Sequence, residues 1–314
     1  MLPLTLLIGF AGAGLLLRRC VAARFEREVD ARLPVGPAGV IPGAEAIGRE
    51  PTGGVRRRAV LLLHGFGDTP QTLRYLADHL CAAGYAVRVP LLPAHGRTLR
   101  EFRTARAEEW VAAARREYVS LLERYGDVAI VGLSMGGALS VILAAETPTV
   151  PALVLVAPYL SMPRRIRHAA RVAWLWGLAV PYLRGGAADR SIHDPAERAK
   201  SLAYGALGAT SLRALLCVVR LAWDALPRVS APTLVIHSRR DHRVPVDAAE
   251  RNFARLGAAE KRLAWTERGG HVLTVDEGRE QVFDLVSRWL EAHPAPAGVL
   301  QSAQQLERRP ARAG

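Results

Sequence analysis

Four short apolar runs, each ending at a turn, constrain the fold of this chain more than any other feature. They are rich in Val, Leu and Ile, and they read AVLLLHG (59–65), DVAIVGL (127–133), ALVLVA (152–157) and PTLVIH (232–237). Continuous apolar runs of this length are typical of strands that are buried on both faces of a parallel sheet. Helical patterns lie between them, so the sequence predicts an α/β protein with a mostly parallel sheet and helices on both faces.

One long stretch interrupts this alternation. Between residues 157 and 232 no strand is evident, and the stretch has helical spacing with three tryptophans and many leucines. We interpret residues 158–230 as a helical cap inserted into a core domain of residues 55–292. Residues 21–54 are rich in Gly and Pro after a short helical start and are expected to form a linker. The tail, residues 293–314, lacks periodicity and is expected to be disordered.

The N-terminal segment differs from the rest of the chain. Residues 1–17 carry no charge, and Arg18 and Arg19 follow directly. A cleaved signal peptide has its positive charge before the apolar run, so the order here favours an uncleaved anchor at residues 1–20. Positive flanks stay in the cytoplasm, which predicts a protein anchored by one N-terminal segment with a cytoplasmic catalytic domain. A helix lying in the membrane interface and a wrongly chosen start codon are the two alternatives.

The net charge of +13 raises the question of a nucleic-acid partner. Nearly all the cations are arginines scattered along the chain, with only short clusters. The sequence has no zinc-ligand spacing and no basic stripe interleaved with aromatic residues. We therefore expect no nucleic-acid partner, and we interpret the charge as a compositional preference for arginine.

The strongest chemical signal is the motif GLSMGG at residues 132–137, which matches G-x-S-x-G. It lies between a predicted buried strand and a helix of small residues, which is the context that a nucleophile elbow requires. The serine must occupy a sharp turn, and glycines two residues away on either side leave room for it. The motif predicts Ser134 as a nucleophile.

A serine nucleophile needs a base that is oriented by an acid. His271 lies in a glycine-flanked loop after the predicted strand at 261–265, and Asp241 lies in the loop after the run PTLVIH. Both loops follow strands, so both side chains are expected at the carboxyl edge of the sheet. Asp276 is a rival acid, although its position is more typical of a helix start. The order Ser, Asp, His agrees with the order in α/β-hydrolases.

Acyl transfer also needs two amides that bind an oxyanion. One is expected from Met135, directly after the nucleophile, and the other from the loop that follows the first core strand, where Phe66 is our choice. A phosphate-binding loop is the alternative, but the loop has neither G-x-G-x-x-G nor a Walker lysine.

Five segments together resemble the small carboxylesterases and monoacylglycerol lipases of the α/β-hydrolase fold. In chain order they are LLLHGFGDTPQTL, VPLLPAHG, GLSMGG, RRDHRVP and GGHVLTVDEGRE. The resemblance covers residues 58–292 and implies an eight-stranded sheet with a small helical cap. It implies the catalytic residues Ser134, Asp241 and His271, the oxyanion donors Phe66 and Met135, and neither a metal nor an organic cofactor. One departure is Ala94, which stands where the family usually has glycine.

These features lead to one functional prediction. The chain is expected to be a serine hydrolase that cleaves carboxylic esters of small or lipid-like substrates through an acyl-enzyme. A thioesterase or an acyltransferase acting on a lipid-like acyl group is the alternative, because the same triad serves those reactions.

Overall fold

The computed structural model describes residues 4–51, 58–185 and 191–294, with side chains from residue 14 onward. In these residues the main sheet has seven strands in the order β1-β3-β2-β4-β5-β8-β9, one fewer than the resemblance implied. Only the edge strand β1 is antiparallel to its neighbour, so the predicted mostly parallel sheet is confirmed. The strands are β1 (Ile47–Arg49), β2 (Arg58–Leu63), β3 (Ala86–Val89), β4 (Asp127–Leu133), β5 (Leu153–Val156), β8 (Thr233–Ser238) and β9 (Lys261–Thr266).

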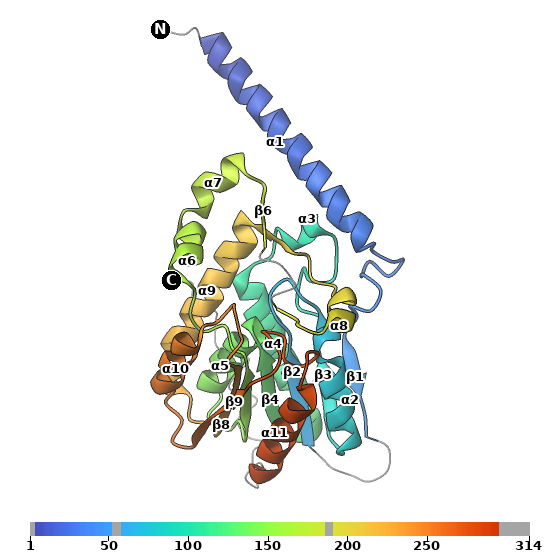
Figure 1. The fold of residues 1–314 in the computed structure, drawn as a ribbon, viewed down its shortest axis with the longest axis vertical. Coiled ribbons are helices and arrows are strands. Elements are labelled where there is room, and N and C mark those ends of the chain that lie inside the picture. Colours follow the sequence, from blue (N-terminus) through green and yellow to red (C-terminus); the bar gives the residue numbers. More distant parts are fainter. Residues whose placement is uncertain (1–3, 52–57, 186–190, 295–314) are drawn as a thin grey trace.

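Helices cover both faces of this sheet (Figure 1). Alternate side chains of each strand point to opposite faces, so each face needs its own apolar cover. Leu61 of β2 belongs to a core that it shares with α4 (Ala107–Tyr125) and α5 (Met135–Glu146). The next residue, Leu62, belongs to a second core with α2 (Arg74–Ala82) and α11 (Arg279–Ala292). The helices η1 (Pro70–Leu73), α3 (Leu99–Phe102) and α10 (Val246–Arg255) also lie in the core domain.

The stretch between β5 and β8 is the one that we interpreted as a helical cap. Its described residues form the α-helices α6 (Arg164–Arg171), α7 (Ala173–Ala179), α8 (Pro195–Ala199) and α9 (Ala209–Ala225), followed by the 3₁₀ helix η3 (Leu226–Arg228). It also holds a two-stranded ribbon of β6 (Tyr182–Arg184) and β7 (Ala206–Gly208), so the expectation of no strand here is wrong. Each strand has three residues, which is too short for an alternating pattern to be visible in sequence. The limits of the domains stay a prediction.

Helix α1 (Leu4–Arg32) extends well into the predicted linker and projects beyond the rest of the molecule (Figure 1). Its second half lies against the cap region rather than leading away from it. The Phe25 ring stacks on the Tyr182 ring with centroids 5.2 Å apart, and Arg32 donates a hydrogen bond of 2.8 Å to the Tyr204 carbonyl. Residues 21–32 are therefore helical, as their sequence indicated, and they pack on the cap region.

Among the described residues, no helix combines the length and the apolar character needed to cross a membrane. The predicted spanning anchor at residues 1–20 is not supported. The reason is visible in α1, because charged residues start at Arg18 and leave only the first 14 residues of the helix apolar. At about 1.5 Å per residue that part is roughly 21 Å long, whereas a bilayer core is about 30 Å thick. The predicted disordered tail lies outside the described residues from residue 295 onward.

Candidate active site

Ser134 occupies the turn between β4 and α5, as the motif predicts. Its backbone has φ 56° and ψ −117°, a conformation that is costly for a residue with a side chain. The neighbouring glycines make this turn sterically possible. A Cβ on Gly136 would lie 1.9 Å from the Leu63 carbonyl oxygen, and one on Gly132 would lie 2.4 Å from the Gly136 carbonyl oxygen. The helix therefore approaches strand β2 so closely that only glycine fits.

The structure brings the three predicted catalytic residues together at the carboxyl edge of the sheet. His271 Nε2 lies 2.8 Å from Ser134 Oγ, and His271 Nδ1 lies 2.8 Å from Asp241 Oδ2. Because β4, β8 and β9 run parallel, the loops that follow them all emerge at this edge. The imidazole thus connects a hydroxyl and a carboxylate in one chain of hydrogen bonds.

Asp241 is buried, yet its surroundings favour the ionised form. Burial raises the pKa of this carboxyl, but the charges and hydrogen bonds of His271, His237 and the Val244 amide outweigh burial and lower it below the ordinary value. Its second oxygen accepts hydrogen bonds from the Arg243 and Val244 amides at 2.7 and 3.0 Å. A carboxylate held in this way fixes the orientation of the imidazole and stabilises its protonated form.

The loop after β2 lies directly against the nucleophile. A Cβ on Gly65 would be 3.4 Å from Ser134 Cβ, so the backbone directly before Phe66 lies beside the nucleophile. Met135 opens helix α5, and amides in the first turn of a helix lack an intrahelical acceptor. In the part of the chain that the structure describes, the Phe66 amide also has no acceptor. Both amides are thus available to an oxyanion.

Two buried histidines hold this loop in place. His64 donates from Nδ1 to the Gly65 carbonyl at 2.9 Å and accepts the Leu92 amide on Nε2 at 3.1 Å. His95 accepts the Gly67 amide on Nε2 at 3.1 Å. Burial lowers the pKa of His64 to about 4 and that of His95 well below its usual value, so both rings are neutral acceptors at pH 7. The part played by His95 was not identified from the sequence.

The sequence also left the role of Asp276 open. The rival acid does not bond to His271; its carboxylate accepts hydrogen bonds from backbone amides, including that of Gly270 at 2.6 Å. Nor does it open the last helix, because α11 starts at Arg279. Ala94, the departure from the family pattern, has φ 63°, in the left-handed region that favours glycine.

Asp68 lies just after Phe66 in the loop that follows β2. From its burial we predict that the stability of the protein depends on pH. Burial raises the pKa of its carboxyl from 3.8 to about 6, so the folded protein holds this proton more tightly than the unfolded chain does. The contribution to stability is present below about pH 4 and is lost as the pH rises to about 6. We expect Asp68→Asn to raise the free energy of unfolding at pH 8 by on the order of 2 kcal/mol and to leave it unchanged at pH 4.

Urea unfolding of both proteins at the two pH values checks this. Asp78→Asn, at a side chain that is 56% exposed, is the control and should show no such difference. An Asp68→Asn effect of the same size at pH 4 and pH 8 would contradict the assignment.

Comparison with known proteins adds to this geometry. A family model described as serine aminopeptidase, S33, matches residues 54–278, which include Ser134, Asp241 and His271. The thermostable monoacylglycerol lipase of Bacillus sp. (strain H-257) is 30% identical over 235 residues, covering 74% of this chain and 90% of that protein. The carboxylesterase of Bacillus subtilis (strain 168) is 28% identical over 240 residues, covering 74% of this chain and 92% of that protein.

A solved structure from work on the metagenome-derived lipolytic enzymes LipS and LipT has the same fold. It superposes with a TM-score of 0.73 at 32% sequence identity, and the match covers 81% of this chain and all of that one. The similarity therefore extends over the sheet and its helices.

Proposed function

We propose that this chain, which belongs to the serine aminopeptidase S33 family of α/β-hydrolases, cleaves carboxylic esters through an acyl-enzyme on Ser134. The observation that carries the proposal is the imidazole of His271, which lies 2.8 Å both from the Ser134 hydroxyl and from the Asp241 carboxylate. Such a chain of contacts turns a weak hydroxyl into a nucleophile. Relatives named as a lipase and a carboxylesterase support an ester as the bond that is cleaved.

The reaction follows from these contacts. As Ser134 Oγ attacks the ester carbonyl, its proton moves to His271 Nε2, and Asp241 stabilises the imidazolium. The negative charge that develops on the carbonyl oxygen is held by the Phe66 and Met135 amides. His271 then protonates the departing alcohol. A water molecule activated by the same imidazole attacks the acyl-enzyme, which releases the acid and restores the serine.

The proposed substrates are monoacylglycerols and related esters with an apolar acyl chain. The support is the name of the relative that matches this chain over 90% of its own length. A peptide-like amide is the competing substrate class, because the family description names an aminopeptidase. Thioesters and acyl acceptors other than water find no support among these relatives.

Labelling with a fluorophosphonate probe tests the nucleophile, and a substrate series tests the class. We expect mass spectrometry to locate the probe on Ser134 and not on Ser120, an exposed serine of α4. We expect p-nitrophenyl esters and a monoacylglycerol to be hydrolysed with a higher kcat/KM than aminoacyl anilides or acyl thioesters. Labelling elsewhere, or faster cleavage of the anilides, would contradict the proposal.

A further inference from the structure

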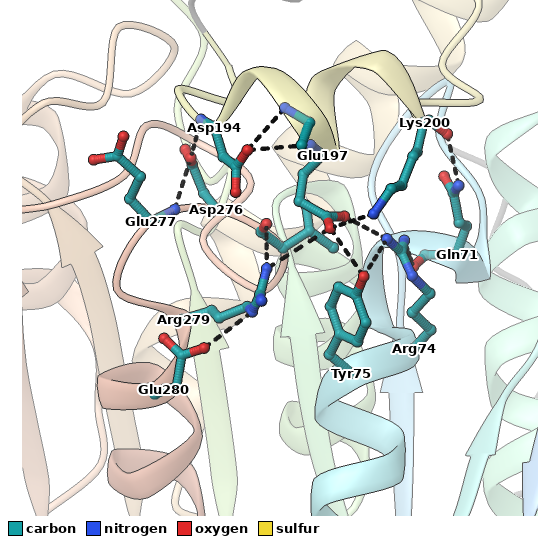
Figure 2. Close-up of polar contacts among 12 residues, drawn as sticks. Gln71, Arg74, Tyr75, Asp194, Glu197, Lys200, Asp276, Glu277, Arg279 and Glu280 are labelled. Carbon is teal, nitrogen blue, oxygen red and sulfur yellow. Dashed lines mark hydrogen bonds and ion pairs between the residues drawn. The ribbon is translucent and has the colours of Figure 1, made fainter.

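Asp276 is a buried carboxylate whose bonds cross from the core to the cap region. Its Oδ1 accepts the amides of Asp194 and Glu277, each at 2.8 Å, and its Oδ2 accepts that of Gly270 at 2.6 Å. The His193 amide lies 2.9 Å from both oxygens. Figure 2 shows Asp276 between Asp194, which precedes α8, and Glu277 of its own turn. One side chain thus joins two segments about 80 residues apart in sequence.

The same two segments are also joined by their main chains. We call residues 191–194 the cap segment and residues 269–272 the histidine loop. The amides of His271 and Val272 both donate to the Ser191 carbonyl, at 2.9 and 3.0 Å. In addition, Arg243 Nε donates to Ser191 Oγ at 2.9 Å, which ties the cap segment to the loop that carries the acid. The backbone of the catalytic histidine is therefore held by the cap segment.

Three residues beyond the cap segment, Glu197 of α8 fastens it to the core helices. This buried carboxylate accepts hydrogen bonds from Tyr75 Oη and Lys200 Nζ, each at 2.9 Å, and pairs with Arg74. Arg279 Nη1 of α11 lies 3.8 Å from Glu197 Oε1 (Figure 2). The cap segment is consequently tied at its start to the loops that carry His271 and Asp241, and beyond its end to helices α2 and α11.

We infer that Asp276 is a positioning residue, which sets His271 by coupling the histidine loop to the cap segment. The inference rests on the proposed function, since it gives His271 the part of the base. Proton transfer requires Nε2 to stay within hydrogen-bond distance of the serine, and a displacement of about 1 Å costs up to roughly 100-fold in rate. A shift of the cap segment moves the amide of His271 with it. The rate of the chemical step therefore depends on the position of the cap segment.

Asp276→Asn separates this role from simple stabilisation, because Oδ1 accepts the Asp194 and Glu277 amides whereas Oδ2 accepts the Gly270 amide. An asparagine that keeps its oxygen at the Oδ1 position retains the bonds to Asp194 and Glu277. Its amide nitrogen then faces the Gly270 amide, donor against donor, so the link to the histidine loop is lost. The His193 amide lies equally close to both oxygens and keeps the one at the Oδ1 position as its acceptor. We expect kcat per active site, counted by titration with the fluorophosphonate probe, to fall about 10- to 100-fold with KM little changed.

The matched control is Asp284→Asn, at a side chain of α11 that is 60% exposed and pairs with Arg288 at 3.8 Å. It should leave kcat and KM unchanged. A loss in Asp276→Asn that disappears after counting active sites would overturn the inference, because that result means a smaller folded fraction. So would an unchanged kcat in a fully active Asp276→Asn protein.

Hydrogen exchange on the wild-type protein gives a second measurement, which needs neither turnover nor a folded variant. The amides of His193 and Asp194 donate to Asp276, and those of His271 and Val272 donate to the Ser191 carbonyl, so we expect peptides from the two segments to lose protection together. A cap segment that exchanges freely while the histidine loop stays protected would overturn the coupling. A wild-type protein that does not react with the probe contradicts the proposed function instead, and exchange still tests the coupling.

Discussion

Ser134→Ala is expected to lower kcat/KM for a p-nitrophenyl ester by about 10⁴- to 10⁶-fold. The reason is chemical, because alanine removes the hydroxyl oxygen that lies 2.8 Å from His271 Nε2 and leaves the imidazole without a nucleophile to activate. The fold should be preserved. Both residues carry a Cβ, so the substitution changes neither the backbone strain at φ 56° nor the packing of α5.

Initial rates with the ester, together with thermal unfolding, measure the two halves of this expectation. Ser120→Ala on the exposed face of α4 is the matched control and should retain full activity. A Ser134→Ala protein with wild-type turnover would show that another residue carries the reaction. A large fall in melting temperature would show that the hydroxyl serves the fold as well.

Gly136→Ala is expected to prevent stable folding, with a loss of about 4 kcal/mol or more. The added Cβ would lie 1.9 Å from the Leu63 oxygen, 2.4 Å from the Leu63 carbonyl carbon and 2.8 Å from the His64 oxygen. All three atoms are backbone, so no side-chain rotation relieves the clash. Helix α5 would have to move away from β2, which pairs with β4 directly before the nucleophile.

Urea unfolding followed by circular dichroism measures this loss, and the yield of folded protein gives a lower bound if the variant precipitates. Gly14→Ala is the matched control, because a Cβ at this helical position meets nothing within 4 Å. Alanine should stabilise α1 there by up to about 1 kcal/mol. A Gly136→Ala protein within 1 kcal/mol of wild type would mean that the close approach of α5 to β2 is not needed.

The parallel sheet and its catalytic edge could be predicted because each depends on local patterns. A strand buried on both faces needs a continuous apolar run, and β2, β4, β5 and β8 are each marked by one. The carboxyl ends of parallel strands share an edge, so residues after the strands could be expected to meet there. The structure places Ser134, Asp241 and His271 in contact, and their catalytic roles stay a proposal.

The expected membrane anchor and the expected absence of strands in the cap depended on sequence patterns that do not determine where a segment packs. The apolar start of the chain was interpreted as a spanning anchor, yet charged residues from Arg18 onward shorten the apolar part of α1. Its later turns pack on the cap region through Phe25, and the sequence of α1 contains no pattern that predicts this contact. The ribbon of β6 and β7 likewise forms from two three-residue segments separated by a helix.

The sequence by itself determined the sheet, the turn at Ser134 and the order of the proposed catalytic residues, since periodicity and glycine spacing are properties of neighbouring residues. Only the tertiary structure decided what ties the loop of His271 to the cap segment, because Asp276 accepts the amides of residues 193 and 194 in addition to those of its own loop. Every residue except proline has such an amide, so composition does not reveal which one a carboxylate binds. The amides that bind Asp276 are selected when the chain between β5 and β8 folds back over the edge of the sheet.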